Sequence, residues 1–235
     1  MANLHDIVQW CNQTLKANEF KDYAPNGLQI EGKSEIKKIV CAVTASEDAI
    51  DAAIAQQADV LLVHHGYFWK GEPYPITGMR GNRIKKLIQH NISLIAYHLP
   101  LDAHPVLGNN AAIADLIGLK NLEALDSSEK HPIGNIAYLE HALSSEQFKT
   151  KLQAIFDFNV IHLPSDKPQI QKVGFCTGGA QDFINKAAQE NCDAYISGEV
   201  SERTFYEAKE LGVHYFACGH HATERTQHRY AHAGE

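Results

Sequence analysis

Two adjacent histidines, His64 and His65, have the chemistry to bind a metal and stand at the end of an apolar run. The run Val60–Val63 is unbroken and rich in β-branched residues, which is typical of a strand buried on both faces. In open α/β sheets, ligands bind beyond the carboxyl ends of the strands. We therefore expect these two imidazoles to lie where such a fold places a ligand site.

Side chains of the same chemistry follow two other predicted strands. Asp102 lies in the predicted loop after Ile92–Tyr97, while His220 and Glu224 follow Val213–Ala217 and are one helical turn apart. Imidazole and carboxylate without thiolate suit Zn, Mn, Fe or Ni, or a two-metal hydrolytic site. The pattern predicts a metal centre made of His64, His65, Asp102, His220 and Glu224.

The elements that must position these residues begin with a strand–helix–strand unit. Lys38–Val43 predicts a strand, and Thr44 with Glu47 has the spacing of a capping box before a helix that ends near Gln57. The strand before the histidine pair follows, and such βαβ units have parallel strands and a right-handed crossover. The other helices expected in this half are Leu4–Leu15, Asn82–Gln89 and Ala111–Ile117, with a turn and short extended piece over Pro25–Ile30.

The middle of the chain predicts a different arrangement from the first half. Ile133–Leu139 and Val160–Leu163 have strand patterns, and Ser144 with Gln147 predicts a capping box before a helix to Phe156. We interpret residues 125–168 as a small α+β insert.

The last part of the chain repeats the first. At a constant offset, Asp48, Ile50, Ala53, Asp59 and His65 align with Asp182, Ile184, Ala187, Asp193 and Glu199. The first four pairs are identical, and the fifth places the carboxylate of Glu199 where the first half has an imidazole. The sequence therefore predicts an α/β fold of duplicated halves, 1–124 and 169–235, around the insert. We expect the halves to form one compact unit with their strand ends facing one another.

Composition excludes several classes of protein. The 235 residues are 44% hydrophobic, enough for a sizeable core, and no stretch reaches the ~20 apolar residues of a membrane span. The net charge of −7 argues against a general nucleic-acid binder, although the basic stretch Arg80–Lys86 could meet a nucleotide. The five cysteines show no CxxC spacing and predict reduced, structural thiols. The first residues lack the pattern of a secretory signal, so we expect a cytoplasmic protein.

Several blocks of the sequence resemble a known family. The blocks are DYAPNGLQIEG, VHHGYFWKG, YHLPLDAHPVLGNN, TGG at Thr177, SGEVSE and GHHATER. Over residues 4–225 the chain is similar to the bacterial branch of the GTP cyclohydrolase 1 type 2 family, also called Nif-three-like proteins. The resemblance implies a duplicated α/β fold, two divalent metal ions and a ring-shaped homohexamer. It assigns the same five residues as metal ligands and places Glu199 and His98 nearby.

The family name implies a reaction on a small-molecule substrate, a nucleotide. The imidazole ring of GTP would open with loss of formate to give a dihydroneopterin triphosphate, with Glu199 or His98 moving a proton and Arg80–Lys86 steering the triphosphate. Two alternatives are another metal-dependent hydrolase, such as a nucleotide phosphoesterase, and a non-catalytic metal-binding ring. The resemblance also implies a helix and a strand after Arg225, whereas residues 226–235 show neither periodicity.

Overall fold

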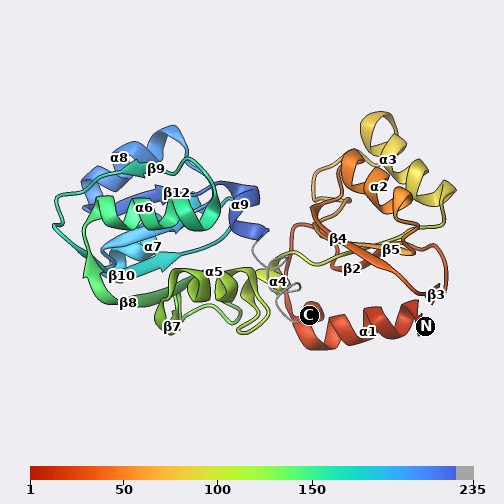
Figure 1. Ribbon diagram of the computed structural model, residues 1–235, viewed down its shortest axis with the longest axis horizontal. Coiled ribbons are helices and arrows are strands. Elements are labelled where there is room, and N and C mark those ends of the chain that lie inside the picture. The colour runs from red at the N-terminus through yellow and green to blue at the C-terminus, as the bar shows by residue number, and fades with distance from the viewer. Residues whose placement is uncertain (226–235) are drawn as a thin grey trace. The chain divides into compact units, whose positions relative to one another are not determined.

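The apolar run before the histidine pair forms β5 (Val60–His65), an interior strand of a four-stranded sheet. The computed structural model, drawn in Figure 1, describes residues 1–225, so the expectations for residues 226–235 lie outside the described part. Contacts within the chain divide it into two compact units, Met1–Leu101 and Asp102–Glu235. The division falls inside a short helix, α4 (Leu99–Ala103).

The strands of the first unit reproduce the predicted parallel arrangement. Besides β5 they are β1 (Ala2–Asn3), β2 (Gly27–Ile30), β3 (Glu35–Ile36), β4 (Ile39–Thr44) and β6 (Ser93–Ala96). The sheet has the order β2-β6-β5-β4, in which β4, β5 and β6 are parallel and β2 is antiparallel to β6. A separate antiparallel pair joins β1 to β3.

Helices cover both faces of this sheet. They are α1 (Leu4–Leu15), the 3-10 turn η1 (Ala17–Glu19), α2 (Glu47–Ala55) and α3 (Gly78–Gln89). Figure 1 shows α2 and α3 on one face and α1 on the other. Leu61 and Val63 pack in the cluster that contains α2 and α3, whereas Val60 packs with α1. Burial on both faces explains why the first four residues of β5 are all apolar.

The start of α2 corrects one sequence prediction. Ser46 is the N-cap, and its Oγ accepts a hydrogen bond from the backbone N–H of Ala49 at 3.2 Å. Thr44, which was expected to cap the helix together with Glu47, is instead the last residue of β4. It is paired with His65 in the β4–β5 ladder, so the helix begins only after it.

The second unit contains a six-stranded sheet. Its strands are β7 (Lys120–Ala124), β8 (Asn135–Leu143), β9 (Ile161–Leu163), β10 (Ile170–Phe175), β11 (Ala194–Ser197) and β12 (His214–Ala217). The order is β7-β8-β10-β11-β12-β9. The strands β10, β11 and β12 are parallel, and the pairs β7–β8, β8–β10 and β12–β9 are antiparallel.

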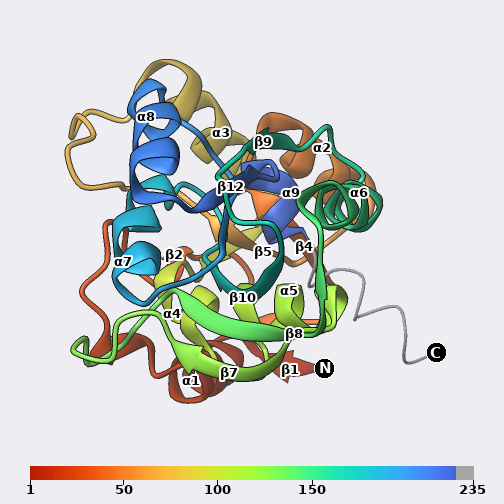
Figure 2. The same cartoon turned by 90° about the vertical axis from the view of Figure 1, so that its left-hand side faces the viewer.

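Helices also cover both faces of this second sheet. They are α5 (Asn109–Ile117), α6 (Ser145–Phe156), the 3-10 turn η2 (Gln181–Phe183), α7 (Ile184–Gln189), α8 (Glu202–Leu211) and α9 (His220–Glu224). Figure 2 shows α7 and α8 on one face and α6 on the other. The helix α5 ends as predicted at Gly118, which takes the left-handed conformation that glycine favours.

Residues 125–168, expected as a small insert, supply β8, α6 and β9. Ser144 and Gln147 form the predicted capping box at the start of α6, with both reciprocal hydrogen bonds present. Because β8 pairs with β10 and β9 pairs with β12, these strands belong to the same sheet as the elements that follow them.

The two units repeat the same arrangement of strands, as the duplication in the sequence predicts. The order β4-β5-β6-β2 in the first sheet matches β10-β11-β12-β9 in the second, with the same directions at every pairing. Ile50 and Ile184, which align in the repeat, are both fully buried in the helix that crosses between the first two parallel strands. The predicted α/β fold of duplicated halves is therefore confirmed.

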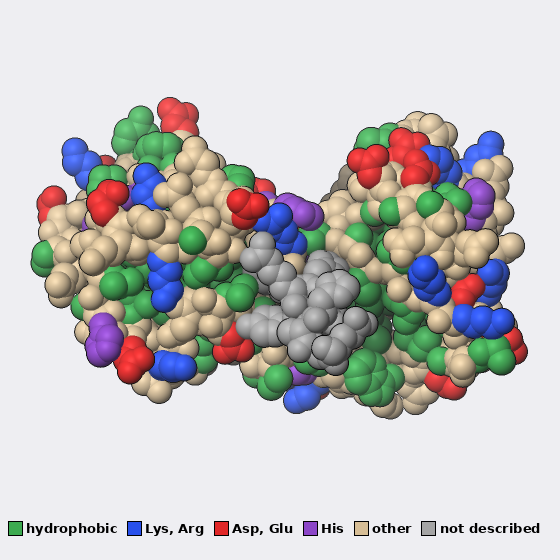
Figure 3. All heavy atoms as spheres, in the orientation of Figure 1, with side chains coloured by type: hydrophobic (Ala, Val, Ile, Leu, Met, Phe, Trp, Pro, Cys, Tyr) green, Lys and Arg blue, Asp and Glu red, His purple; other side chains and the backbone are tan. Residues whose placement is uncertain are grey.

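The described surface carries charges of both signs. Figure 3 shows acidic and basic side chains interspersed over the face it presents. Among residues 1–225, no helix is both long enough and apolar enough to cross a membrane.

Candidate metal centre

The histidine pair occupies the last two positions of β5 in the first unit. The Nδ1–H of His64 donates to the carbonyl oxygen of Tyr97 at 2.8 Å, because a carbonyl can only accept. The Nδ1 of His65 lies 3.1 Å from the hydroxyl oxygen of Thr44. In both rings, therefore, Nε2 is the nitrogen suited to a metal. The pair ends the strand, whereas the sequence pattern placed it just beyond.

A third imidazole joins the pair within the first unit. His98 follows β6, and one ring nitrogen each from His64, His65 and His98 lie within 4.8 Å of one another. The Nδ1 of His98 is 2.7 Å from the carboxylate Oδ1 of Asp22. Burial opposes ionisation of Asp22, but hydrogen bonds from His98 and Asn26 outweigh it and lower the pKa of Asp22.

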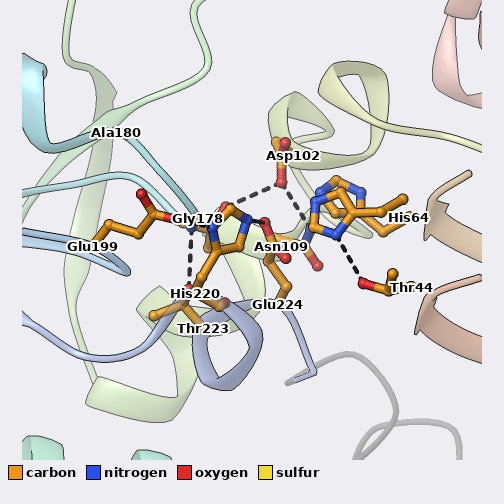
Figure 4. A network of polar contacts seen from close by, with 12 residues as sticks. Thr44, His64, Asp102, Asn109, Gly178, Ala180, Glu199, His220, Thr223 and Glu224 are labelled. Atoms are coloured by element: carbon orange, nitrogen blue, oxygen red, sulfur yellow. Dashed lines mark hydrogen bonds and ion pairs between the residues drawn. The ribbon is translucent and has the colours of Figure 1, made fainter. Parts of the chain in front are cut away.

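Asp102 lies in α4, which corrects the prediction of a loop at this point. Its side chain is buried, and its Oδ1 accepts hydrogen bonds from Asn109 Nδ2 at 2.8 Å and from Thr177 Oγ1 at 3.0 Å. Both donors use the same oxygen, so Oδ2 carries neither of these two bonds. These two hydrogen bonds fix the orientation of the Asp102 side chain, as hydrogen-bond donors around metal sites commonly do for carboxylate ligands. Figure 4 shows Asp102 and Asn109 in this network.

His220 and Glu224 lie one turn apart in α9 and face each other. The Nε2 of His220 is 3.0 Å from Glu224 Oε1, and its Nδ1 is 2.6 Å from Glu199 Oε1 (Figure 4). Glu224 is buried, whereas Glu199 is half exposed. The hydrogen bond to Glu224 and then the charges of both carboxylates, against the effect of burial, raise the pKa of His220 to about 9.

A glycine keeps space open at these ligand atoms. A Cβ on Gly178 would lie 2.5 Å from Glu224 Oε1 and 3.1 Å from His220 Nε2. The φ angle of Gly178, +66°, also lies in the left-handed region that favours glycine. The preceding residue is Thr177, the hydroxyl donor to Asp102. Thr177 and Gly178 of the TGG turn therefore lie beside all three predicted ligands of the second unit, whose carboxylate oxygens and imidazole nitrogen are donor types that suit a divalent metal.

The side chains that orient the ligands were not found from the sequence. Sequence reasoning gave no role in the metal centre to Thr177, Asn109 or Asp22, and it assigned Thr44 to a helix cap. The only available signal was that Thr177, Asn109 and Asp22 lie in the blocks that carry the family resemblance. A hydroxyl or amide donor has no periodicity that marks it as the partner of a metal ligand.

Two residues of the basic stretch Arg80–Lys86 have acidic partners inside the first unit. Arg80 pairs with Glu72 and donates to the carbonyl oxygens of Pro73 and Pro75, which holds the segment between β5 and α3 in place. Lys86 pairs with two acidic residues of α2. These two side chains have structural partners, which weakens the prediction that the stretch steers a triphosphate.

The fold and these groups define a class of protein. It is a duplicated α/β protein in which each half carries imidazole or carboxylate side chains at the carboxyl ends of its parallel strands, with donors that could bind a metal. The chain belongs to the Duf34/NIF3 (NGG1p interacting factor 3) family, whose model matches residues 2–231. This result confirms the resemblance seen in the sequence.

Individual relatives and a solved structure agree with this assignment. The chain is 50% identical over 219 residues to a protein of Vibrio cholerae named GTP cyclohydrolase 1 type 2 homolog, covering 91% of this chain and 85% of that one. A protein of Haemophilus influenzae with the same name is 48% identical over 227 residues, covering 96% and 89%. The solved structure of protein ybgI, described as of unknown function, matches with a TM-score of 0.93 and 42% identity, covering 97% and 91%.

Proposed function

We propose that the chain is a metal-dependent hydrolase in which His64, His65, Asp102, His220 and Glu224 hold two divalent metal ions. One observation carries the proposal: each of the three histidines has its Nδ1 held by an oxygen of its own unit. The partners are the Tyr97 carbonyl, the Thr44 hydroxyl and the Glu199 carboxylate. Metal-binding histidines characteristically use one ring nitrogen for the metal and the other for such a partner.

The donor chemistry fits Zn, Fe, Mn or Ni, since imidazole nitrogens and carboxylate oxygens are available without thiolates. When bound, such ions polarise substrate oxygens and lower the pKa of a coordinated water toward 7. The protein's own residues orient the site, with Asn109 and Thr177 holding Asp102 and with Glu199 holding His220. His98 and Glu199 are the residues placed to move a proton beside these ligands.

We propose GTP as the substrate, with opening of the guanine imidazole ring and release of formate. The support is the name of the relatives, GTP cyclohydrolase 1 type 2 homolog, together with a donor set suited to hydrolysis. The test is to incubate metal-loaded protein with GTP and to measure formate and a fluorescent pterin. His65→Ala is the inactive variant, and His141→Ala, at an exposed position of β8, is the matched histidine control.

The outcomes separate the candidate activities. Formate and pterin from the wild type and from His141→Ala, but not from His65→Ala, support the GTP reaction. No product above the His65→Ala background overturns it. Release of phosphate from nucleotide esters without pterin points to a phosphoesterase instead. A binding partner that is retained by Asp102→Ala, in a protein without turnover, points to the non-catalytic alternative.

The two groups of ligands come from different units, so their joint action needs its own test. We propose that they hold the same pair of ions. Zn²⁺ affinity is measured for the wild type, His65→Ala, Glu224→Ala and the double variant. Residues that bind shared ions show a coupling free energy of about 0.5–3 kcal/mol, whereas independent sites are additive. Additive losses, or a metal content of one ion per chain, contradict the shared two-metal centre.

Assembly and cellular location are further proposals that rest on the family. We propose a ring-shaped homohexamer in the cytoplasm, built from the full-length chain. Native mass spectrometry of the metal-loaded protein measures the number of subunits, and a monomer or dimer contradicts the hexamer. Fractionation of cells that express the chain measures its location.

A further inference from the structure

Asp22 is a buried carboxylate that accepts hydrogen bonds on both oxygens. Its side chain is only 3% exposed. The Oδ1 atom receives the backbone N–H of Tyr23 at 2.6 Å and faces Nδ1 of His98 at 2.7 Å. The Oδ2 atom receives Nδ2 of Asn26 and the backbone N–H of Leu99, each at 2.9 Å. Three of the four partners can only donate, and the hydrogen bonds from His98 and Asn26 lower the pKa of Asp22 despite its burial, so the carboxyl group is an ionised acceptor at neutral pH.

This arrangement determines the tautomer of His98. An imidazole nitrogen that faces an ionised carboxylate oxygen at 2.7 Å must carry the proton, because two lone pairs would repel. The Nδ1 atom of His98 is therefore the donor, and Nε2 of the neutral ring carries the lone pair. The backbone N–H of His98 also donates to Asn26 Oδ1 at 2.8 Å, which fixes the residue at the end of β6.

The ring of His98 lies among the groups of the first unit that the metal proposal uses. Its centroid is 5.1 Å from that of His64 and 5.8 Å from that of His65. The ring of Trp69 packs edge-on against it at 5.0 Å. The side chain of His98 is 18% exposed, so it is enclosed but remains accessible. A fixed ring with a basic nitrogen at this position is suited to accept a proton.

We propose that Asp22 is a positioning residue that holds His98 as the Nδ1–H tautomer and directs Nε2 toward the histidine pair, where it accepts a proton during the reaction. The role of Nε2 in the reaction rests on the proposed hydrolase function. The tautomer and its dependence on Asp22 do not. The device resembles the pairing of Glu199 with His220 in the second unit, where a carboxylate also holds Nδ1 of an imidazole.

The test measures the tautomer directly by long-range ¹H–¹⁵N NMR of the labelled full-length protein, in chelated and Zn²⁺-loaded forms. The His98 signals are assigned by their loss in His98→Gln. We expect the wild type to show Nδ1–H, and Asp22→Ala and Asp22→Asn to show a mixture or the Nε2–H form. The asparagine variant keeps the size of the side chain. Its amide N–H₂ group, however, would face N–H groups whose hydrogen bonds the carboxylate of Asp22 accepts.

Asn26→Ala is the matched control, since it removes hydrogen bonds from the same turn but leaves Asp22 opposite His98 Nδ1. It should retain the wild-type tautomer. Where the proposed activity is present, Asp22→Asn should lower kcat by about 10²-fold or more at unchanged metal content and KM. A wild-type ring in the Nε2–H form, or an Asp22 variant with the tautomer unchanged, overturns the proposal. A changed tautomer with unchanged kcat overturns the proton-accepting role of His98.

Discussion

Asp59 and Asp193 make the same set of hydrogen bonds in the two units. Asp59 accepts from the backbone N–H groups of Lys37 and Lys38 and from Lys33 Nζ, at 2.8, 3.2 and 2.9 Å. Asp193 accepts from the N–H groups of residues 171 and 172 and from Lys167 Nζ, at 3.0, 2.9 and 3.2 Å. Each carboxylate thus connects the start of an interior parallel strand to the beginning of the neighbouring strand, just before β4 in the first unit and within the first residues of β10 in the second.

Removal of either carboxylate should destabilise the unit to which it belongs. Each of Asp59→Ala and Asp193→Ala leaves two backbone N–H groups without their acceptor, at a cost of about 1–3 kcal/mol in free energy of unfolding. Hydrogen exchange should show the loss of protection in the first unit for Asp59→Ala and in the second for Asp193→Ala. Asp115→Ala, at an exposed position of α5, is the control. A loss of protection spread equally over both units for either variant would contradict this assignment.

Substitution of Gly178 should weaken metal binding more than it weakens the fold. In Gly178→Ala, the added methyl group meets Glu224 Oε1 and His220 Nε2, so we expect Zn²⁺ affinity to fall by about 10–100-fold. Gly212→Ala is a close control, because Gly212 has the same φ of +66° but nothing within 4 Å of an added Cβ. Both variants should lose about 1–2 kcal/mol of stability from backbone strain. Equal Zn²⁺ affinities of the two variants would show that Gly178 does not maintain the ligand space.

The stability of the metal-free protein should fall in alkaline solution because of His220. Its pKa is raised to about 9 in the folded state, from an ordinary value of 6.5. Because its pKa is raised in the folded state, protonated His220 stabilises the fold. This stabilisation is complete below pH 6.5 and is lost as the pH rises through about 9. Denaturant unfolding of chelated wild type and His220→Gln measures this contribution. The stability difference between them should shrink across that interval, and a constant difference would exclude the pairing with Glu224 and Glu199 as its cause.

Acid should destabilise the second unit through His162. Burial and then the neighbouring His214, with a smaller opposing effect of Glu146, lower the pKa of His162 to about 4. As the pH falls, His162 binds a proton in the unfolded chain before it does so in the folded chain. The stabilisation that the neutral ring gives to the fold is therefore present above pH 6.5 and is lost as the pH falls through about 4.

The variant His162→Phe isolates this effect. It keeps an aromatic ring in the place where His162 stacks on Phe216, with centroids 4.5 Å apart, but it cannot titrate. Its unfolding free energy should depend less on pH between about 4 and 6.5 than that of the wild type. His141→Phe serves as the control at an exposed position. An acid dependence identical to that of the wild type would rule out His162 as the titrating group.

Much of the fold could be predicted because its signals are local. Val60–Val63 is apolar without interruption since β5 is covered on both faces, and Gly118 ends α5 by the conformation that only glycine adopts easily. The aligned residues Asp59 and Asp193 revealed the duplication, because the same bonds are needed twice. These features depend on neighbours in sequence or on a repeat that can be counted.

The parts that sequence reasoning missed depend on contacts across the chain. The helix α4 is only five residues long and contains Pro100, which the first turn of a helix tolerates, so the segment has no apolar periodicity that would predict a helix. The choice of Ser46 over Thr44 as the cap was decided by the pairing of Thr44 with His65 in another strand. Thr177 reaches Asp102 from far along the chain, and no local pattern connects a hydroxyl donor to a distant carboxylate.

The matching strand ends of the two halves have a consequence for how such a protein changes over time. In a symmetric dimer of identical subunits, one substitution appears at both copies of a position. Here His65 and Glu199 stand at corresponding places in a single polypeptide, so an imidazole and an acid can differ at these places while Asp59 and Asp193 are alike. A repeat within one chain therefore allows two equivalent scaffolds to carry different reactive side chains.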